Sequence, residues 1–254
     1  MEGNKSGVNA SLVRTFVVGA SETGPRGRVR LACLLDYFQE SAAEHAGKLG
    51  ASVLDLIKKK LTWILSRYHV RIFRYPLWGE ELLMTTWPSS RHGLFALREF
   101  ELADQSGNLV AAATSSWMVL DVLKKKPVPV VENLGDFLHD PRRAIADDFA
   151  PLPRLGKIDL ELPFRVKMGD LDWNRHVNHV VYIEWAVESA PADVISASLP
   201  VEIEVDYRGE VLYGETVLSR TEVLRQGEET SLCHQIVRQD GLQELARGRT
   251  LWRK

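Results

Sequence analysis

The residues with the clearest capacity for chemistry stand at alternate positions of one short segment. Asp172, Asn174 and His176 supply a carboxylate, an amide and an imidazole, directly before a strongly apolar stretch that begins near Asn178. In an extended segment, side chains two residues apart project to the same side. We therefore expect the three groups to converge beside the start of a buried helix, where backbone N–H groups near Asn178 and His179 can stabilise a developing oxyanion.

Each of these residues also has an ordinary structural explanation. Asp and Asn favour turns, and Asn178 is a good N-cap for the helix that it starts. That explanation is sufficient for any one of them alone. The combination of three different polar groups beside one helix start is what favours a reactive site.

The two cysteines give no comparable signal. Cys33 and Cys233 lie far apart in the sequence and form neither a metal-binding pattern nor a disulfide framework. A nucleophilic pair of Cys233 with His234 is disfavoured, because neighbours on a strand point to opposite faces. Both cysteines are expected to be small buried residues, and the sequence predicts neither a bound metal nor an organic cofactor.

Length and composition bound the class of protein. The chain has 254 residues, 45% of them hydrophobic and 26% charged, enough for one large domain or two smaller ones. Its formal net charge of −2 argues against a nucleic-acid-binding protein. No apolar run reaches the roughly 18 residues of a membrane span, and the polar first ten residues lack the core of a secretory signal. We therefore expect a cytoplasmic protein.

Periodicity predicts two helices and many strands. Apolar residues recur at helical spacing over 31–49 and 178–190. Turn residues at Pro88-Ser89-Ser90 and Asp104–Asn108 separate runs that are typical of strands. These runs are 11–20, 61–73, 80–87, 94–103 and 109–120, then 161–168, 202–208, 216–224, 230–238 and 245–252.

The order of strand, helix and several strands occurs twice, which indicates two copies of one unit. Trp78-Gly79-Glu80 is similar to Tyr213-Gly214-Glu215, and Glu40-Ser41-Ala42 to Glu188-Ser189-Ala190. A proline-rich stretch lies between the copies. We predict an N-terminal domain over 1–125, a linker over 126–160 and a C-terminal domain over 161–254. Each domain is expected to be α+β, a long antiparallel sheet curled around a buried helix.

The polar segment resembles a known family. The string Asp172-x-Asn174-x-His176-Val177-Asn178-x-x-x-Tyr182 looks like the motif of acyl-acyl-carrier-protein (acyl-ACP) thioesterases, and similarity extends over about 11–252. The resemblance implies a tandem (double) hotdog fold and places Asp172, Asn174 and His176 in the active site. It adds Glu210, which stands in the matching Tyr-Arg-x-Glu context. Many plant members have a cysteine after that glutamate, but this chain has Val211, so a cysteine nucleophile is excluded there.

The resemblance also implies roles for these residues. Glu210 or Asp172 would activate a water, or attack the thioester directly, and His176 would assist the carboxylate or the leaving thiolate. Asn174 would position the carbonyl. The first copy aligns Gly24–Val29 with the motif and has no carboxylate there, so it should be chemically silent and shape the acyl pocket. The candidate pocket residues are Cys33, Tyr37, Phe38, Trp63 and Leu65.

The implied partners are acylated ACP, its fatty acyl chain and a second copy of the chain in a homodimer. ACP is acidic, so a basic dock is expected at Lys58–Lys60, Lys124–Lys126 or Arg142-Arg143. Alternatives are a hotdog hydrolase of acyl-CoA, a non-catalytic acyl-binding module and a dehydratase. Dehydratases of this fold usually pair one His with one acidic residue and lack the Asp-x-Asn-x-His-Val-Asn string.

Overall fold

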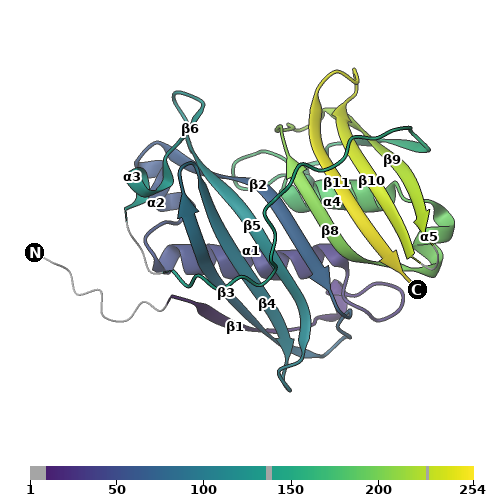
Figure 1. Ribbon diagram of the computed structural model, residues 1–254, viewed down its shortest axis with the longest axis horizontal. Coiled ribbons are helices and arrows are strands. Elements are labelled where there is room, and N and C mark those ends of the chain that lie inside the picture. The colour runs from purple at the N-terminus through teal and green to yellow at the C-terminus, as the bar shows by residue number, and fades with distance from the viewer. Residues whose placement is uncertain (1–9, 136–138, 227–228) are drawn as a thin grey trace, which may run out of the picture. The chain divides into compact units, whose positions relative to one another are not determined.

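The computed structural model describes residues 10–135, 139–226 and 229–254. The chain divides into two compact units. The N-terminal unit comprises residues 1–66 and 75–146, and the C-terminal unit comprises 67–74 and 147–254. Each unit is an antiparallel sheet with a long central helix, so the α+β double hotdog is confirmed (Figure 1). No helix within the described ranges is both long and apolar enough to span a bilayer.

In the N-terminal unit the strand order is β1-β3-β4-β5-β2, with β6 paired to β5. Helix α1 (Leu31–Lys48) lies along the sheet (Figure 1) and buries Leu34, Leu35 and Phe38 completely. Apolar residues at positions i, i+1 and i+4 form the stripe that a helix must bury against a sheet. The strands are β1 (Leu12–Val17), β2 (Leu61–Ile72), β3 (Glu81–His92), β4 (Phe95–Asp104), β5 (Leu109–Asp121) and β6 (Lys126–Val128).

In the C-terminal unit the second part of β2 pairs with β8, and the order continues β8-β11-β10-β9-β7. Helix α4 (His179–Glu188) contacts β8, β9, β10 and β11, and most of its circumference is buried, as its composition predicts. The strands are β7 (Leu160–Arg165), β8 (Leu199–Tyr207), β9 (Thr216–Gln226), β10 (Glu229–Arg238) and β11 (Glu244–Arg253).

Some expectations for local structure were wrong. Pro88-Ser89-Ser90 does not end a strand, because β3 continues through it with a bulge between Pro88 and Ser90. A bulge accommodates the extra residue without ending the ladder. Short helices that the periodicity did not reveal are α2 (Val53–Lys58), α3 (Val130–Leu134) and α5 (Ala192–Ala197), with single 3-10 turns at η1 (Ala20–Glu22) and η2 (Met168–Asp170).

Over residues 139–159, the proline-rich stretch after α3 has few regular elements and accepts hydrogen bonds from side chains of both units. In the N-terminal unit the indole of Trp87 donates to the carbonyl of Arg142. In the C-terminal unit Arg247 donates to the carbonyl of Leu152. Each of these bonds gives a backbone carbonyl a hydrogen-bond donor. The boundary at 126–160 stays a prediction.

The two units repeat one hydrogen-bonded turn before their helices. In the first, Thr23 pairs with Val29 and the N–H of Gly24 donates to the carbonyl of Arg28 at 2.8 Å. In the second, Leu171 pairs with Val177 and the N–H of Asp172 donates to the carbonyl of His176, also at 2.8 Å. The alignment of Gly24–Val29 with the polar motif is therefore confirmed.

A buried polar network fills part of the core of the C-terminal unit. The imidazole of His234 hydrogen-bonds the hydroxyls of Thr221 (3.1 Å) and Thr250 (2.8 Å), and Ser189 bonds Thr221 in turn. Burial lowers the pKa of His234 to about 3. The folded protein therefore keeps this imidazole neutral at pH values where the unfolded chain protonates it.

This gives a pH dependence with a definite sign. The unfolded pKa is about 6.5, so the stability is fully present above that pH and is lost as the pH falls towards the folded pKa. We expect His234 alone to reduce the free energy of unfolding by about 1.4 kcal/mol per pH unit below pH 6. Urea unfolding of His234→Gln and wild type between pH 7 and 5 checks this. Parallel curves for the two proteins would contradict it.

Candidate active site

The predicted catalytic segment is a tight turn, not an extended strand. The Oδ1 atom of Asp172 accepts the N–H groups of Asn174 at 2.8 Å and His176 at 3.1 Å. Arg175 has φ +64°, a left-handed conformation that the equivalent turn gives to Gly27 (φ +67°). The expectation of period-two projection was wrong because Asp172 uses its carboxylate to fold the backbone back on itself.

Backbone hydrogen bonds join this turn to the loop that carries Glu210. The N–H of Val177 donates to the carbonyl of Val211 at 3.1 Å. His176 and Glu210 each precede one of these residues, so their side chains come together, with Nε2 of His176 3.5 Å from Oε2 of Glu210. Both side chains retain access to solvent, which a water-activating pair needs.

Other residues hold the loop in place. The hydroxyl of Tyr182 donates to the carbonyl of Gly209 at 3.0 Å, and Arg238 donates to the carbonyl of Glu210 at 2.9 Å. A Cβ at position 209 would lie 3.0 Å from Leu245 Cδ2, so the loop passes close to β11. Tyr182 belongs to the motif but received no role from the sequence. Arg238 gave no sequence signal, since a lone arginine late in a strand is unremarkable.

Arg208, two residues before Glu210, has other carboxylates as its described ion-pair partners. It forms ion pairs with Asp206 (2.5 Å) and Glu244 (3.2 Å). A role for Glu210 as a mere ion-pair partner of Arg208 is therefore not supported. Glu210 keeps a carboxylate whose described ion pair is with His176.

The backbone N–H groups of the two residues at the start of α4 differ in whether they can bind an oxyanion. The side chain of Asn178 caps α4 by accepting the N–H of Val180 at 3.0 Å, and its own N–H donates to the carbonyl of Asp170 at 2.8 Å. Asn178 therefore cannot offer its amide to an oxyanion. The N–H of His179 occupies the first helical position, which has no acceptor within its own helix.

The side chain of His179 is unsuited to acid–base work. Its ring lies against Tyr68 and Tyr207, at 6.0 and 6.2 Å between ring centroids. Burial lowers its pKa to about 4, so the imidazole is neutral near pH 7. Of the two histidines in the motif, His176 is the one that contacts a carboxylate.

The N-terminal unit lacks these groups at the matching positions. Its turn has Gly24 and Arg28 where the second turn has Asp172 and His176. Val29 donates to the carbonyl of Pro76 as Val177 donates to Val211, so Tyr75 stands in the place of Glu210. Tyr75 is buried, and burial raises the pKa of its hydroxyl. The same backbone arrangement therefore carries no acid–base pair there.

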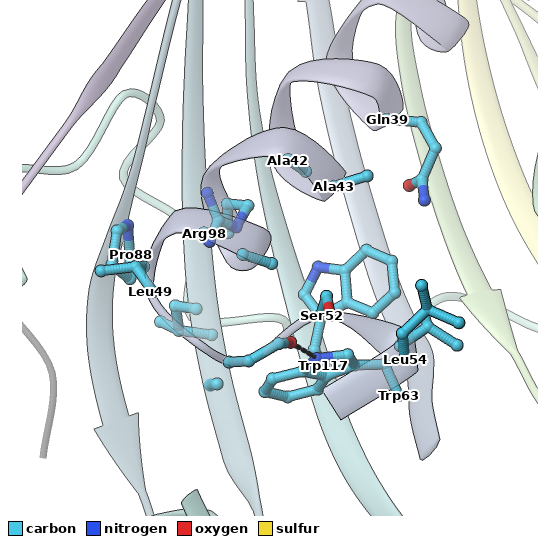
Figure 2. A pocket seen from close by; sticks show the side chains of 15 residues that line it. Gln39, Ala42, Ala43, Leu49, Ser52, Leu54, Trp63, Pro88, Arg98 and Trp117 are labelled. Carbon is cyan, nitrogen blue, oxygen red and sulfur yellow. Dashed lines mark hydrogen bonds between the residues drawn. The ribbon is translucent and has the colours of Figure 1, made fainter. Parts of the chain in front are cut away.

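The N-terminal unit instead contains an apolar cavity of about 260 Å³ (Figure 2). Small residues of α1, including Ala42 and Ala46, form one wall, and the indoles of Trp63 and Trp117 meet edge to face on another. Among the five pocket candidates only Trp63 lines this cavity.

The other four candidates have different surroundings. Phe38 is in the core against Phe100, and the hydroxyl of Tyr37 donates to Glu22 at 2.6 Å. Leu65 is buried, and Cys33 is half-buried. None of them lines the cavity. The sequence could not identify the true lining because alanines on a helix carry no distinctive signal.

One group of side chains in the C-terminal unit has the spacing of a metal site. Ligand atoms of His69, Glu202 and Glu204 lie within 4.8 Å of one another. However, Arg71 pairs with Glu202 at 3.1 Å and Arg249 pairs with Glu204. The guanidinium groups already balance both carboxylates, so the group fits an ion-pair network better than a metal site.

Comparison with known proteins agrees with this architecture. Residues 10–138 match the model of the acyl-ACP thioesterase N-terminal domain, and residues 156–254 match that of the C-terminal domain. Over 95% of its length the chain is 29% identical to a chloroplastic palmitoyl-acyl carrier protein thioesterase of Gossypium hirsutum, of which it spans 62%. It is 28% identical to oleoyl-acyl carrier protein thioesterase 2 of Arabidopsis thaliana, of which it spans 76%.

Solved structures share the fold. The 12:0-ACP thioesterase from Umbellularia californica superposes with a TM-score of 0.87 at 24% identity, covering 96% of this chain and 94% of that one. An acyl-ACP thioesterase from Bacteroides thetaiotaomicron gives 0.83 at 21% identity, covering 96% and 98%. With both family models matched along most of its length, the chain belongs to the acyl-ACP thioesterase family.

Proposed function

We propose that the chain hydrolyses the thioester of fatty acyl-ACP and releases a free fatty acid and ACP. The observation that carries this proposal is the pair of His176 and Glu210, 3.5 Å apart beside a turn that Asp172 holds. Membership of the family and the names of the plant relatives support the substrate class.

The geometry favours Glu210 as the general base. Its exposed carboxylate can accept a proton from water, and His176 can stabilise that carboxylate or protonate the leaving thiolate. The water oxygen forms the bond to the thioester carbon, and the carbon–sulfur bond then breaks. The N–H of His179 and the amide of Asn174 would stabilise the carbonyl oxygen as it gains charge.

Asp172 is better suited to positioning, because one of its oxygens already accepts two backbone N–H groups. Asparagine can keep that acceptor, whereas alanine cannot. We expect Asp172→Asn to lower kcat by no more than about tenfold and Asp172→Ala to lower it by about 100-fold or more, since misplaced catalytic groups cost on that order. Steady-state hydrolysis of acyl-ACP measures both. Equal, large losses in the two variants would make Asp172 the base instead.

We also propose that the acyl chain occupies the cavity of the N-terminal unit. Its lining is mostly apolar, with Gln39, Ser52 and Arg98 as its polar side chains, and a mostly apolar lining suits a hydrocarbon chain. Replacing Ala42 with leucine fills part of that space (Figure 2). We expect the preferred acyl length to shorten, with kcat/KM for the longest accepted chain falling about 10-fold or more relative to the shortest.

A panel of acyl-ACPs of increasing length measures this shift. Ala192→Leu, at the exposed start of α5, is the matched control and should leave the length profile unchanged. An unaltered profile in Ala42→Leu would place the acyl chain elsewhere.

The deciding experiment for the reaction is the release of free thiol from acyl-ACP and from acyl-CoA with the same acyl group. Faster, salt-sensitive hydrolysis of acyl-ACP is expected, because an acidic carrier adds electrostatic attraction. Equal rates would favour an acyl-CoA hydrolase. Binding without hydrolysis would favour an acyl-binding module. A cytoplasmic location and a homodimer stay predictions.

A further inference from the structure

One end of the N-terminal unit combines exposed lysines with exposed apolar side chains. Helix α2, the end of β5, β6 and α3 gather there (Figure 1). The N–H of Val122 donates to the carbonyl of Lys60 at 3.0 Å, which brings two lysine runs together. We call this region the basic end surface. Its lysines are Lys58, Lys59, Lys60, Lys124, Lys125 and Lys126.

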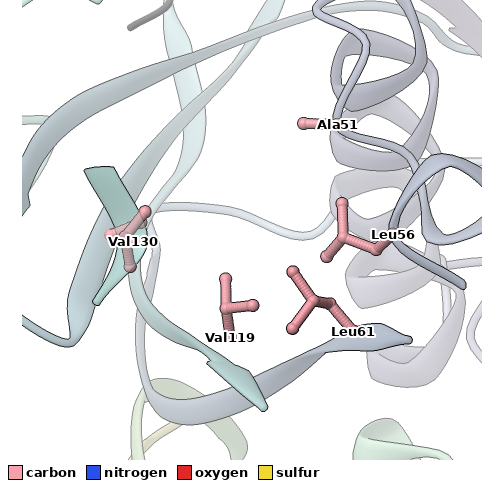
Figure 3. Close-up of a cluster of buried hydrophobic side chains, with 6 residues drawn as sticks. Ala51, Leu56, Leu61, Val119 and Val130 are labelled. Carbon is pink, nitrogen blue, oxygen red and sulfur yellow. The ribbon is translucent and has the colours of Figure 1, made fainter. Parts of the chain in front are cut away.

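Apolar side chains lie among these lysines. The most exposed are Leu54 (60%), Ile57 (48%), Val122 (47%), Leu123 (70%) and Val131 (47%). Beneath them lies a cluster of buried apolar side chains that includes Leu56 (Figure 3). Leu56 belongs to α2, as do the exposed Leu54 and Ile57. Helix α2 is therefore apolar on the face towards the core and also on the face towards solvent. Exposed apolar groups of this kind are typical of a surface that contacts a membrane or another molecule.

The local charge is strongly positive. Asp55 and Asp121 pair with Lys58 and Lys124, each at 3.6 Å. Glu132 of α3 is a third acidic residue here, so six lysines against three acidic residues leave an excess of three positive charges on this surface. Lys60 and Lys125 also have positive φ values, +58° and +53°. Glycine adopts that conformation more easily, so the backbone alone does not account for lysine at these positions.

The basic end surface adjoins the apolar cavity. Leu54 lines the cavity and is itself exposed, and Ser52 and Val53 at the start of α2 line it as well (Figure 2). The side chain of Leu54 is therefore shared by the cavity and the basic end surface, so an apolar ligand in the cavity would lie next to that surface.

From these observations we infer that the basic end surface binds an anionic lipid bilayer. Lysines are attracted to anionic headgroups, and the interspersed apolar side chains can enter the interface between headgroups and acyl chains. All six cations are lysines, whose ammonium groups act as compact point charges. An acidic protein would be recognised better by the bidentate fork of arginine. The arginines expected in a protein dock are engaged, Arg142 with Asp140 and Arg143 with Glu99.

The test is flotation of the full-length chain with vesicles, which needs no enzymatic turnover. Wild type should bind vesicles that contain phosphatidylglycerol and should bind phosphatidylcholine vesicles weakly. Binding to the anionic vesicles should fall as salt is raised. Because each lysine near such a surface contributes about fivefold in affinity, the triple change Lys124→Gln, Lys125→Gln and Lys126→Gln should weaken binding by about 100-fold.

A second variant separates the apolar contribution from the charge. Ile57→Ser with Leu123→Ser keeps all six lysines and should lower affinity by about 10-fold or more. Both side chains are exposed, so folding should persist. Matched controls are Lys48→Gln, Lys157→Gln and Lys167→Gln for the charges, and Leu109→Ser with Leu242→Ser for the apolar side chains. These controls should bind as wild type does.

Three outcomes would overturn the inference. The first is that wild type does not float with anionic vesicles, and the second is that the surface variants and their controls bind equally. The third is that the variants lose affinity for ACP in a direct titration while vesicle binding is unchanged, which would make the surface a protein dock. If wild type bound anionic vesicles but did not hydrolyse acyl-ACP, that result would contradict the proposed reaction and leave this inference standing.

Discussion

Replacing Glu210 with glutamine is expected to lower kcat for acyl-ACP hydrolysis by about 10²–10⁴-fold, the range that a positioned general base contributes. Glutamine has nearly the same shape and keeps an oxygen near His176, but it cannot take a proton from water. KM should change little, because Glu210 lies on an exposed loop and its backbone contact with Arg238 does not involve the side chain.

The matched control for that variant is Glu188→Gln, an exposed glutamate at the end of α4. It should retain wild-type kcat. Single-turnover release of ACP thiol distinguishes a slow chemical step from slow product release. If Glu210→Gln hydrolysed acyl-ACP at the wild-type rate, the carboxylate would not be the base and the mechanism would fail.

The largest effect on stability is expected at Glu99. This glutamate is completely buried and accepts hydrogen bonds from Ser89, Thr114 and the N–H of Ala144, while Arg143 pairs with it at 2.8 Å. Glu99→Ala would leave a partly buried guanidinium and several donors without their acceptor. Removing one partner of a buried ion pair costs about 3–5 kcal/mol, and we expect about 3 kcal/mol here because Arg143 retains some solvent.

Urea unfolding followed by tryptophan fluorescence measures this loss. Glu101→Ala is the matched control, because residue 101 lies on the same face of β4 and is only partly buried. It should cost less than about 1 kcal/mol. A similar loss in both variants would mean that the network around Glu99 is not the source of the stability.

Much of the architecture could be predicted from the sequence, because long periodic segments determine their own structure. The helix over 31–49 and most strands were placed within a few residues of α1 and the observed ladders. The six-residue helices α2 and α5 were missed, since a hydrophobic period needs more than two turns to be visible. The strand at Pro88 was ended too early, because a bulge and a turn have similar residue signals.

The members of the candidate active site stay a prediction, and their geometry differs from the one expected. The motif supplied His176 and the resemblance supplied Glu210, and the structure brings those two together. The turn at Asp172 could not be foreseen, because an aspartate can either fold its own backbone or project freely. The loop contacts of Tyr182 and Arg238 depend on strands that meet only after folding.

The matching turns at Gly24–Val29 and Leu171–Val177 show which part of the local structure comes from the backbone and which part comes from the side chains. The main-chain hydrogen bonds are common to both turns, whereas the carboxylate of Asp172 adds two hydrogen bonds in the second turn, where the first turn has Gly24. The N-terminal turn therefore offers a similar backbone on which aspartate, histidine and glutamate could be introduced at positions 24, 28 and 75.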